Sequence, residues 1–145
     1  MLQPNNLVPT LEQKKAQATD AAKHIIAATL SARATIAARR FLEEKKDFTI
    51  KAINYECSAG TVELIARDED GVLRFVKVNV AEGKLPEEPT SEADRKRLER
   101  IALSYLAENE ELPGGIAFDC VSMAAIRSKG ELKKAMLKYH SNLFN

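Results

Sequence analysis

The sequence has no tryptophan and only two cysteines, Cys57 and Cys120, among its 145 residues. Two cysteines are too few for the disulfide framework of a small secreted domain, and they lack the paired spacing of a zinc site. We therefore expect both thiols to be reduced and structural. A length of 145 residues suits one domain with a hydrophobic core.

Long apolar runs are also missing. The sequence contains no run of about 18 apolar residues, the length needed to span a membrane. Its first 25 residues contain Glu12 and Asp20 and lack the apolar core of a signal peptide. These absences predict a cytoplasmic protein with no membrane partner. Neither sign of charge is in excess, since 22 Lys and Arg face 21 Asp and Glu. Any binding to a polyanion must therefore come from a local patch.

The motifs of several enzyme classes are absent. We find no Gly-rich phosphate loop, no Ser-His-Asp set and no zinc-ligand spacing. His24 and His140 have no nucleophile or metal-ligand spacing to join them, so both are expected to be structural. What is present, 45% hydrophobic and 30% charged residues, is typical of a soluble globular domain.

The first expected element is a helix. Thr10 and Gln13 match a capping box, and no Pro or Gly follows until after residue 46, which predicts one long helix or two abutting ones. An apolar stripe at helical spacing should pack on a sheet. Its members are Ile25, Leu30, Ala34, Ala37, Phe41 and Leu42.

Alternating residues 48–55, 61–67 and 72–80, joined by short turns, predict a three-strand antiparallel meander. After a Pro-rich linker at 82–89, Ser91 and Asp94 cap a second helix, and residues 116–123 form a fourth strand parallel to the third. The apolar stripe of the second helix consists of Leu98, Ile101, Ala102, Tyr105 and Leu106. Residues 127–145 are basic and amphipathic, and Leu143 and Phe144 are expected to dock on the core.

Helix, antiparallel meander, helix and parallel strand form the layout of a restriction-endonuclease-like α/β core. Several motifs carry the similarity further: ARRFL at 38–42, NY at 54–55, GTVELIARD at 60–68, FVKVN at 75–79, FDCV at 118–121 and NLF at 142–144. In this order and spacing, residues 34–144 resemble the YraN-like family of bacterial, predicted endonuclease-fold proteins. The resemblance divides the chain into an N-terminal helical extension, 1–32, and a restriction-endonuclease-like domain, 33–145.

The resemblance implies a metal-dependent site, with an aspartate on the second strand and a glutamate and lysine on the third. Here Thr61 and Glu63 stand where the family has Glu and Asp, and Lys77 and Asn79 stand where it has Glu and Lys. A family glutamate on the first helix corresponds to Thr35. Mg²⁺ prefers clustered carboxylates. The vestigial site of these five residues is therefore expected to hold no metal and to need no cofactor.

Residues i and i+2 of a strand share a face, so Thr61, Glu63, Lys77 and Asn79 are expected to line one cleft. Glu63 and Lys77 then form a cross-strand ion pair, either as an ordinary partly exposed salt bridge or as a retained ligand or phosphate contact. A working nuclease site, with Mg²⁺ or Mn²⁺, would need other carboxylates. Asp68 and Asp70 are better explained by their turn, and Asp119 points away from the neighbouring Phe118 and Cys120.

Four basic residues of the second helix are candidates for contacts with DNA or RNA phosphates: Arg95, Lys96, Arg97 and Arg100. A solvated charged face is the alternative, and it is favoured for the basic residues after 127. The Ala-rich extension suits packing on a second copy or another protein. The function expected is that of a catalytically degenerate nuclease homologue that binds nucleic acid. The alternatives are an active metal-dependent endonuclease and a protein-interaction module.

Overall fold

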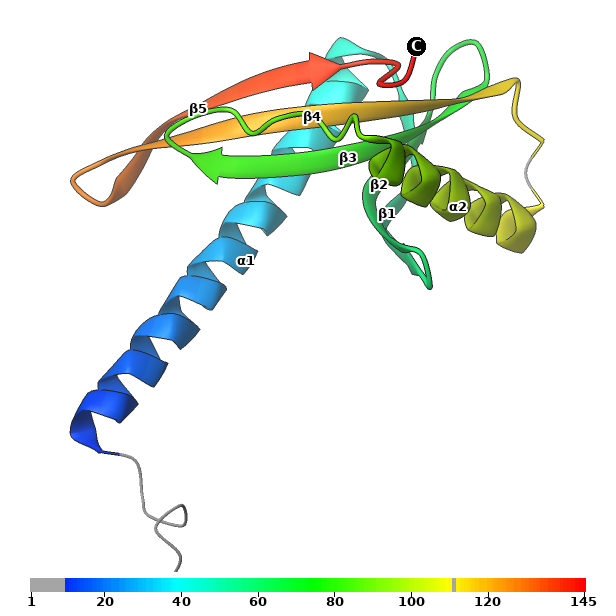
Figure 1. Cartoon of the computed structure of the whole chain (residues 1–145). Helices are drawn as coiled ribbons and strands as arrows, with labels where there is room; N and C mark the ends of the chain where they lie inside the picture. The colour runs from blue at the N-terminus through cyan, green and yellow to red at the C-terminus, as the bar shows by residue number, and fades with distance from the viewer. Residues whose placement is uncertain (1–9, 111) are drawn as a thin grey trace, which may run out of the picture.

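The computed structural model describes residues 10–110 and 112–145. In this part of the chain one five-stranded sheet carries a helix on each face, with the strands in the order β1-β2-β3-β4-β5 (Figure 1). The expected α/β class and the restriction-endonuclease-like core layout are confirmed.

Helix α1 is continuous over Leu11–Lys45. The Thr10 side chain accepts a hydrogen bond from the Gln13 amide, and the Gln13 side chain accepts one from the Thr10 amide at 2.8 Å. The predicted capping box is therefore present. It satisfies two of the amides that every helix start leaves unpaired.

The two halves of α1 have different surroundings. Ala34, Ala38 and Leu42 are buried against the sheet, whereas the N-terminal half projects beyond the sheet into open space (Figure 1). Ile25, expected in the sheet-packing stripe, is 66% exposed, so this part of the prediction is wrong. Helical periodicity gave the correct side of the helix but not the point at which the sheet ends. The domain boundary expected at residue 32 falls inside this continuous helix.

The antiparallel meander consists of β1 (Thr49–Cys57), β2 (Gly60–Arg67) and β3 (Val72–Glu82). In the turn between β2 and β3, the Asp68 carboxylate accepts hydrogen bonds from the amides of Asp70 and Val72 at 2.9 and 3.0 Å. This local bonding is the physical reason that Asp68 favours a turn. The structural explanation of Asp68 is thereby confirmed.

Helix α2 (Glu92–Asn109) crosses from β3 to β4 (Gly115–Ser128), which pairs with β3 in parallel. Its predicted capping box of Ser91 and Asp94 is present. Strand β4 is longer than expected, because its register with β3 continues from Gly115 to Ala125 opposite Glu82.

The basic segment after β4 contains a strand, β5 (Glu131–His140), to which the sequence assigned no element. It pairs antiparallel with β4 through a tight turn at Lys129 and Gly130, whose φ angles are 54° and 80°. Positive φ at both central residues is typical of the two-residue turn that matches strand twist. The Lys-Gly pair was the overlooked signal.

Two apolar clusters lie on the two faces of the sheet. Leu64, Val76 and Val121 pack with the buried side of α1. Phe75 and Ile101 belong to the cluster under α2, and the C-terminal Leu143 and Phe144 pack against it as predicted. Among the described residues, no helix has the length and apolar character needed to cross a bilayer.

Candidate functional site

The site implied by the resemblance lies where β2 and β3 separate. These strands pair from Leu64 opposite Val76 to Arg67 opposite Leu73. Beyond Leu64, the Glu63 side chain takes the place of a main-chain partner, and its carboxylate accepts a hydrogen bond from the Val78 amide at 2.7 Å. Glu63 is therefore fixed by the local divergence of the two strands.

Lys77 supplies the second contact of the same carboxylate. Its Nζ lies 3.0 Å from Glu63 Oε2, while the side chains of Lys77 and Glu63 are 30% and 16% exposed. Lys77 Nζ also donates to the main-chain oxygen of Thr61 at 3.4 Å. The predicted cross-strand ion pair is confirmed. It brings together Thr61, Glu63 and Lys77.

Asn79 lies two residues further along the same face of β3 and donates to Cys120 Sγ at 3.8 Å. Cys120 also shares a 3.5 Å contact with Ser122 Oγ. Burial is the main cause that raises the pKa of the Cys120 thiol, and the nearby Glu88 and Glu63 carboxylates act in the same direction. A buried thiol with a raised pKa is a poor nucleophile.

Thr35 occupies a different environment. It is buried on α1, and its hydroxyl donates to the Ser31 carbonyl of the same helix at 3.1 Å. Among the described residues, no hydrogen bond joins Thr35 to the other four residues of the vestigial site.

The donor set does not fit a divalent metal. Both oxygens of Glu63 already accept hydrogen bonds, one from an ammonium group that repels a cation and one from a backbone amide. Within residues 10–110 and 112–145, no cluster of three or more His, Cys, Asp or Glu could hold a metal ion. Mg²⁺ demands several oxygen ligands in near-octahedral geometry. We therefore derive no metal-assisted step from these residues.

The basic cluster of α2 is exposed, but acidic neighbours partly neutralise it. Arg95 pairs with Glu99 at 3.0 Å, and Arg97 pairs with Asp94. No ion pair forms at Lys96 or Arg100 within the described part of the chain. These two side chains carry most of the cluster's available positive charge.

Gly60 connects this cluster to the vestigial site. A Cβ atom at Gly60 would lie 3.4 Å from Cδ of Arg97 and 3.7 Å from Ile101, so the Arg97 stem passes directly over the glycine. Gly60 immediately precedes Thr61, whose carbonyl accepts from Lys77. Arg97 thus lies next to the residue that precedes Thr61, whereas Lys96 and Arg100 lie on the side of α2 away from its buried stripe.

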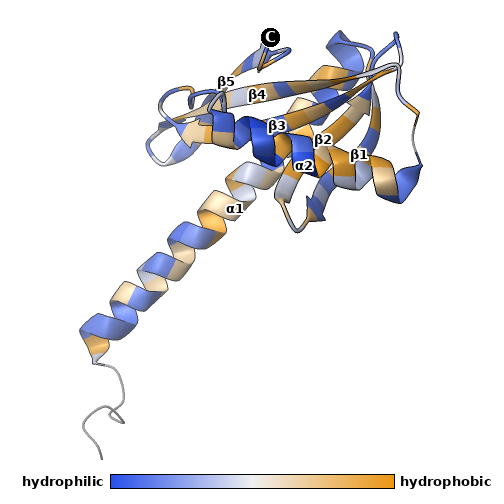
Figure 2. Cartoon of the chain, turned by 45° about the vertical axis from the view of Figure 1, so that its right-hand side comes forward, coloured by the Kyte–Doolittle hydropathy of each residue, from blue (hydrophilic) through white to orange (hydrophobic). Residues whose placement is uncertain are grey.

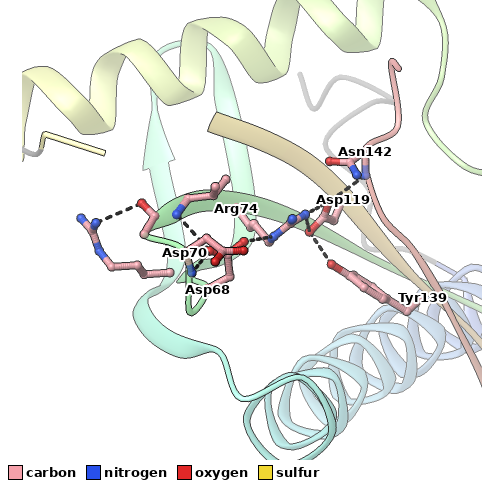
Figure 3. A network of polar contacts seen from close by, with 9 residues as sticks. Asp68, Asp70, Arg74, Asp119, Tyr139 and Asn142 are labelled. Atoms are coloured by element: carbon pink, nitrogen blue, oxygen red, sulfur yellow. Dashed lines mark hydrogen bonds and ion pairs between the residues drawn. The ribbon is translucent and has the colours of Figure 1, made fainter. Parts of the chain in front are cut away.

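A buried polar network on the opposite face was missed from the sequence (Figure 3). Asp119 is fully buried and lies between Arg74, at 3.1 and 3.2 Å, and the Tyr139 hydroxyl, at 2.6 Å. The main-chain amide of Asn142 donates to the same carboxylate at 2.9 Å, and Arg74 also donates to the Asp68 carboxylate at 2.9 Å. This network joins β3, β4 and β5 with the C-terminal segment.

The network shifts the acidity of its members. Burial raises the pKa of Tyr139 well above its ordinary value, and the hydrogen bond to the Asp119 carboxylate acts in the same direction. For Asp68, burial opposes ionisation, but the hydrogen bonds from Val72 and Arg74 lower its pKa. Every described member finds a partner within the network, which indicates a structural role.

One sequence signal could have revealed the network. Asp119 interrupts an apolar strand. Arg74 is a charged residue in the first half of β3, and strand alternation places it on the same face as the apolar Val76. A buried charge requires a partner. Parallel pairing of β3 with β4 would have brought these two side chains to the same face.

Comparison with known proteins places the chain in a family. The model of uncharacterised protein family UPF0102 matches residues 35–123, more than half of the 145 residues. The chain belongs to this family. The family assignment expected from the motifs is thereby confirmed, and the matched segment contains both the vestigial site and the basic cluster.

Two relatives agree with this assignment. A UPF0102 protein of Nocardia farcinica is 37% identical over 89 residues, which cover 59% of this chain and 68% of the relative. A UPF0102 protein of Symbiobacterium thermophilum is also 37% identical, over 79 residues that cover 52% of this chain and 66% of the relative. Both relatives carry only the family description.

Proposed function

We propose that this UPF0102 protein is a catalytically degenerate nuclease homologue that binds nucleic acid and leaves it intact. The observation that carries the proposal is the contact of Arg97 with Gly60, because it sets one residue of the basic cluster of α2 next to the strand whose Glu63 carboxylate is engaged by Lys77. A phosphate backbone that follows α2 would reach the rim of the former active site.

The charges support local rather than general attraction. The formal net charge is +1, so long-range steering of a polyanion is weak. Lys96 and Arg100 provide two exposed cations on one helix, and each phosphate that such a group neutralises makes affinity salt-dependent. We therefore expect modest, strongly salt-sensitive affinity without sequence readout.

The test is fluorescence anisotropy with labelled branched, duplex and single-stranded DNA at two or more salt concentrations, with Mn²⁺ present. The variant Lys96→Ala/Arg100→Ala should bind more weakly, and its salt slope on duplex DNA should fall by about 2 if both residues contact phosphate. The matched control, Lys134→Ala/Lys138→Ala, removes two exposed charges from β5 and should bind like the unmodified protein.

A denaturing gel of each titration endpoint separates binding from cleavage. Intact DNA with salt-sensitive binding supports the proposal. Metal-dependent cutting that Glu63→Ala abolishes would instead establish the active endonuclease. No binding of any of the three DNAs at low salt, or equal losses in both double variants, would overturn the role of the α2 cluster.

A further inference from the structure

Helix α1 carries a second apolar side that the sheet does not cover. We call it the outer stripe; it consists of Leu11, Ala18, Ala22, Ile25, Thr29, Ala32 and Ile36. Leu11, Ala18, Ile25 and Ala32 are spaced seven residues apart, and Ala22, Thr29 and Ile36 follow the last three of them by four residues. This is the spacing of the contact seam of a coiled coil.

The outer stripe is exposed along its whole length. Leu11 is 68% exposed, Ile25 66% and Ile36 60%. Ile36 follows buried Ala34 by two residues, or about 200° around the helix, so the stripe lies on the side of α1 opposite its buried residues. Ile25 and Thr29 also border an open hollow between α1 and the end of β3. Figure 2 shows hydrophobic residues among hydrophilic ones along the projecting half of α1.

Charge distribution also distinguishes the outer stripe. Between Lys15 and Arg33 the helix carries two charged residues, Asp20 and Lys23, and both lie on the side away from the stripe. A projecting helix without tertiary contacts is marginal in water, because most helical stability in proteins comes from packing. An uncharged apolar seam on such a helix is suited to another helix.

We propose that the outer stripe is the dimerisation surface of this protein and that its occupant is α1 of a second copy, in antiparallel orientation. Residues whose numbers add to 47 then face each other in successive layers. Leu11 meets Ile36, Ala18 meets Thr29, and Ala22 meets Ile25. Each larger side chain meets a partner of the stripe, and the small residues allow close approach of the helices.

The antiparallel orientation follows from charge and shape. In a parallel pair, Lys14, Lys15 and Arg33 would each lie beside their own copies. In the antiparallel pair Lys15 faces Ala32, and Arg33 lies near Glu12 of the other copy. The sheets, attached to the C-terminal half of α1, then occupy opposite ends of the helix pair (Figure 1).

Sedimentation equilibrium of the full chain tests the dimer with a matched pair of variants. Ala22→Glu places a charge in the outer stripe, whereas Ala27→Glu places the same charge one heptad before Ala34, on the opposite side of the same projecting part of α1. We expect the unmodified protein and Ala27→Glu to be dimers and Ala22→Glu to be a monomer. Helical content by circular dichroism should show that both variants fold.

Disulfide formation tests the orientation in a Cys57→Ser background. Ala22→Cys should cross-link to its own copy, because Ala22 and its copy lie about 4.5 Å apart along the axis in the antiparallel layers. Leu11→Cys should not, because the two copies lie about 37 Å apart. Efficient cross-linking of Leu11→Cys would overturn the antiparallel arrangement.

The proposal also fails if the unmodified protein is a monomer throughout the concentration range, or if Ala22→Glu and Ala27→Glu leave the same dimer. In the second case the interface lies elsewhere. These outcomes are independent of DNA binding, so they are distinguishable from failure of the proposed function.

Discussion

Glu63 and Asp119 are two carboxylates that each meet a cation across neighbouring strands, on opposite faces of one sheet. Asp119 is fully buried and bonds to Arg74, Tyr139 and the Asn142 amide. Glu63 is partly exposed and bonds to Lys77 and one amide. Asp119 therefore connects four segments of the fold, whereas Glu63 connects β2 and β3 at the point where the two strands separate.

The two carboxylates should therefore differ in the free energy that is lost when their partners are removed. A buried ion pair that loses one partner leaves an uncompensated charge, whereas a partly exposed pair is solvated by water. Substitutions of Glu63 or Lys77 should therefore cost little unfolding free energy, whereas substitutions of Asp119 or Arg74 should cost more.

The largest expected effect comes from Asp119→Ala. Removal of the carboxylate leaves the Arg74 guanidinium, at 16% side-chain exposure, with Asp68 alone and takes the acceptor from the Tyr139 hydroxyl and the Asn142 main-chain amide; losses of this kind amount to about 3–5 kcal/mol of unfolding free energy. Urea unfolding measures it. Asp70→Ala, at an exposed turn position beside Asp68, is the control and should stay within about 0.5 kcal/mol of the unmodified protein. Similar values for the two variants would contradict the structural role of Asp119.

A smaller effect is expected for Tyr139→Phe. The hydroxyl donates one hydrogen bond to a charged acceptor, and such bonds contribute about 1.5–3 kcal/mol. Because Arg74 and the Asn142 amide still satisfy Asp119, the loss should lie near the lower limit. Urea unfolding at neutral pH checks this value; a loss as large as that of Asp119→Ala would show that the hydroxyl matters as much to folding as the Asp119 carboxylate itself, and would contradict the sharing of that carboxylate among three donors.

Tyr139 should also make the free energy of unfolding depend on pH in the alkaline range. Its pKa is raised in the folded state, mainly by burial, so the folded protein retains a proton that the unfolded chain releases above about pH 10. Stability should therefore fall as pH rises through this range. Tyr139→Phe should flatten this slope but not abolish it, because burial also raises the pKa of Tyr55.

The smallest effect is expected at the Glu63–Lys77 pair. A double-mutant cycle with Glu63→Gln and Lys77→Met should give a coupling free energy of about 0.2–1 kcal/mol, in keeping with partial exposure of both side chains. Glutamine retains an acceptor for the Val78 amide. A coupling free energy above about 3 kcal/mol would place this pair in the same class as Asp119 and Arg74.

Local signals in the sequence predicted much of the fold. Both capping boxes, the meander, the α2 stripe and the parallel fourth strand follow from short-range patterns, and the structure contains them. Strand β5 escaped because its alternation is broken by paired lysines, Lys133 and Lys134, on an exposed edge. The exposure of Ile25 escaped because periodicity specifies a side of a helix and not the extent of its partner.

The site divides in a similar way. Strand alternation and the family pattern predicted the Glu63–Lys77 pair, since both residues lie on one hairpin. The Asp119 network depends on side chains 45 residues apart, and its geometry arises only when the parallel register of β3 and β4 is set. The contact of Arg97 with Gly60 likewise depends on how α2 packs on the sheet, which short-range sequence patterns do not predict.

Calorimetric titration of the protein with Mn²⁺ most directly tests the proposal that the Glu63–Lys77 ion pair leaves no divalent-metal site. The comparison variant is Glu63→Asp/Lys77→Glu/Asn79→Lys, which restores the aspartate of the second strand and the glutamate and lysine of the third strand in the family pattern. We predict no saturable heat for the unmodified protein and saturable binding for this variant. Saturable Mn²⁺ binding by the unmodified protein that Glu63→Ala removes would contradict the account.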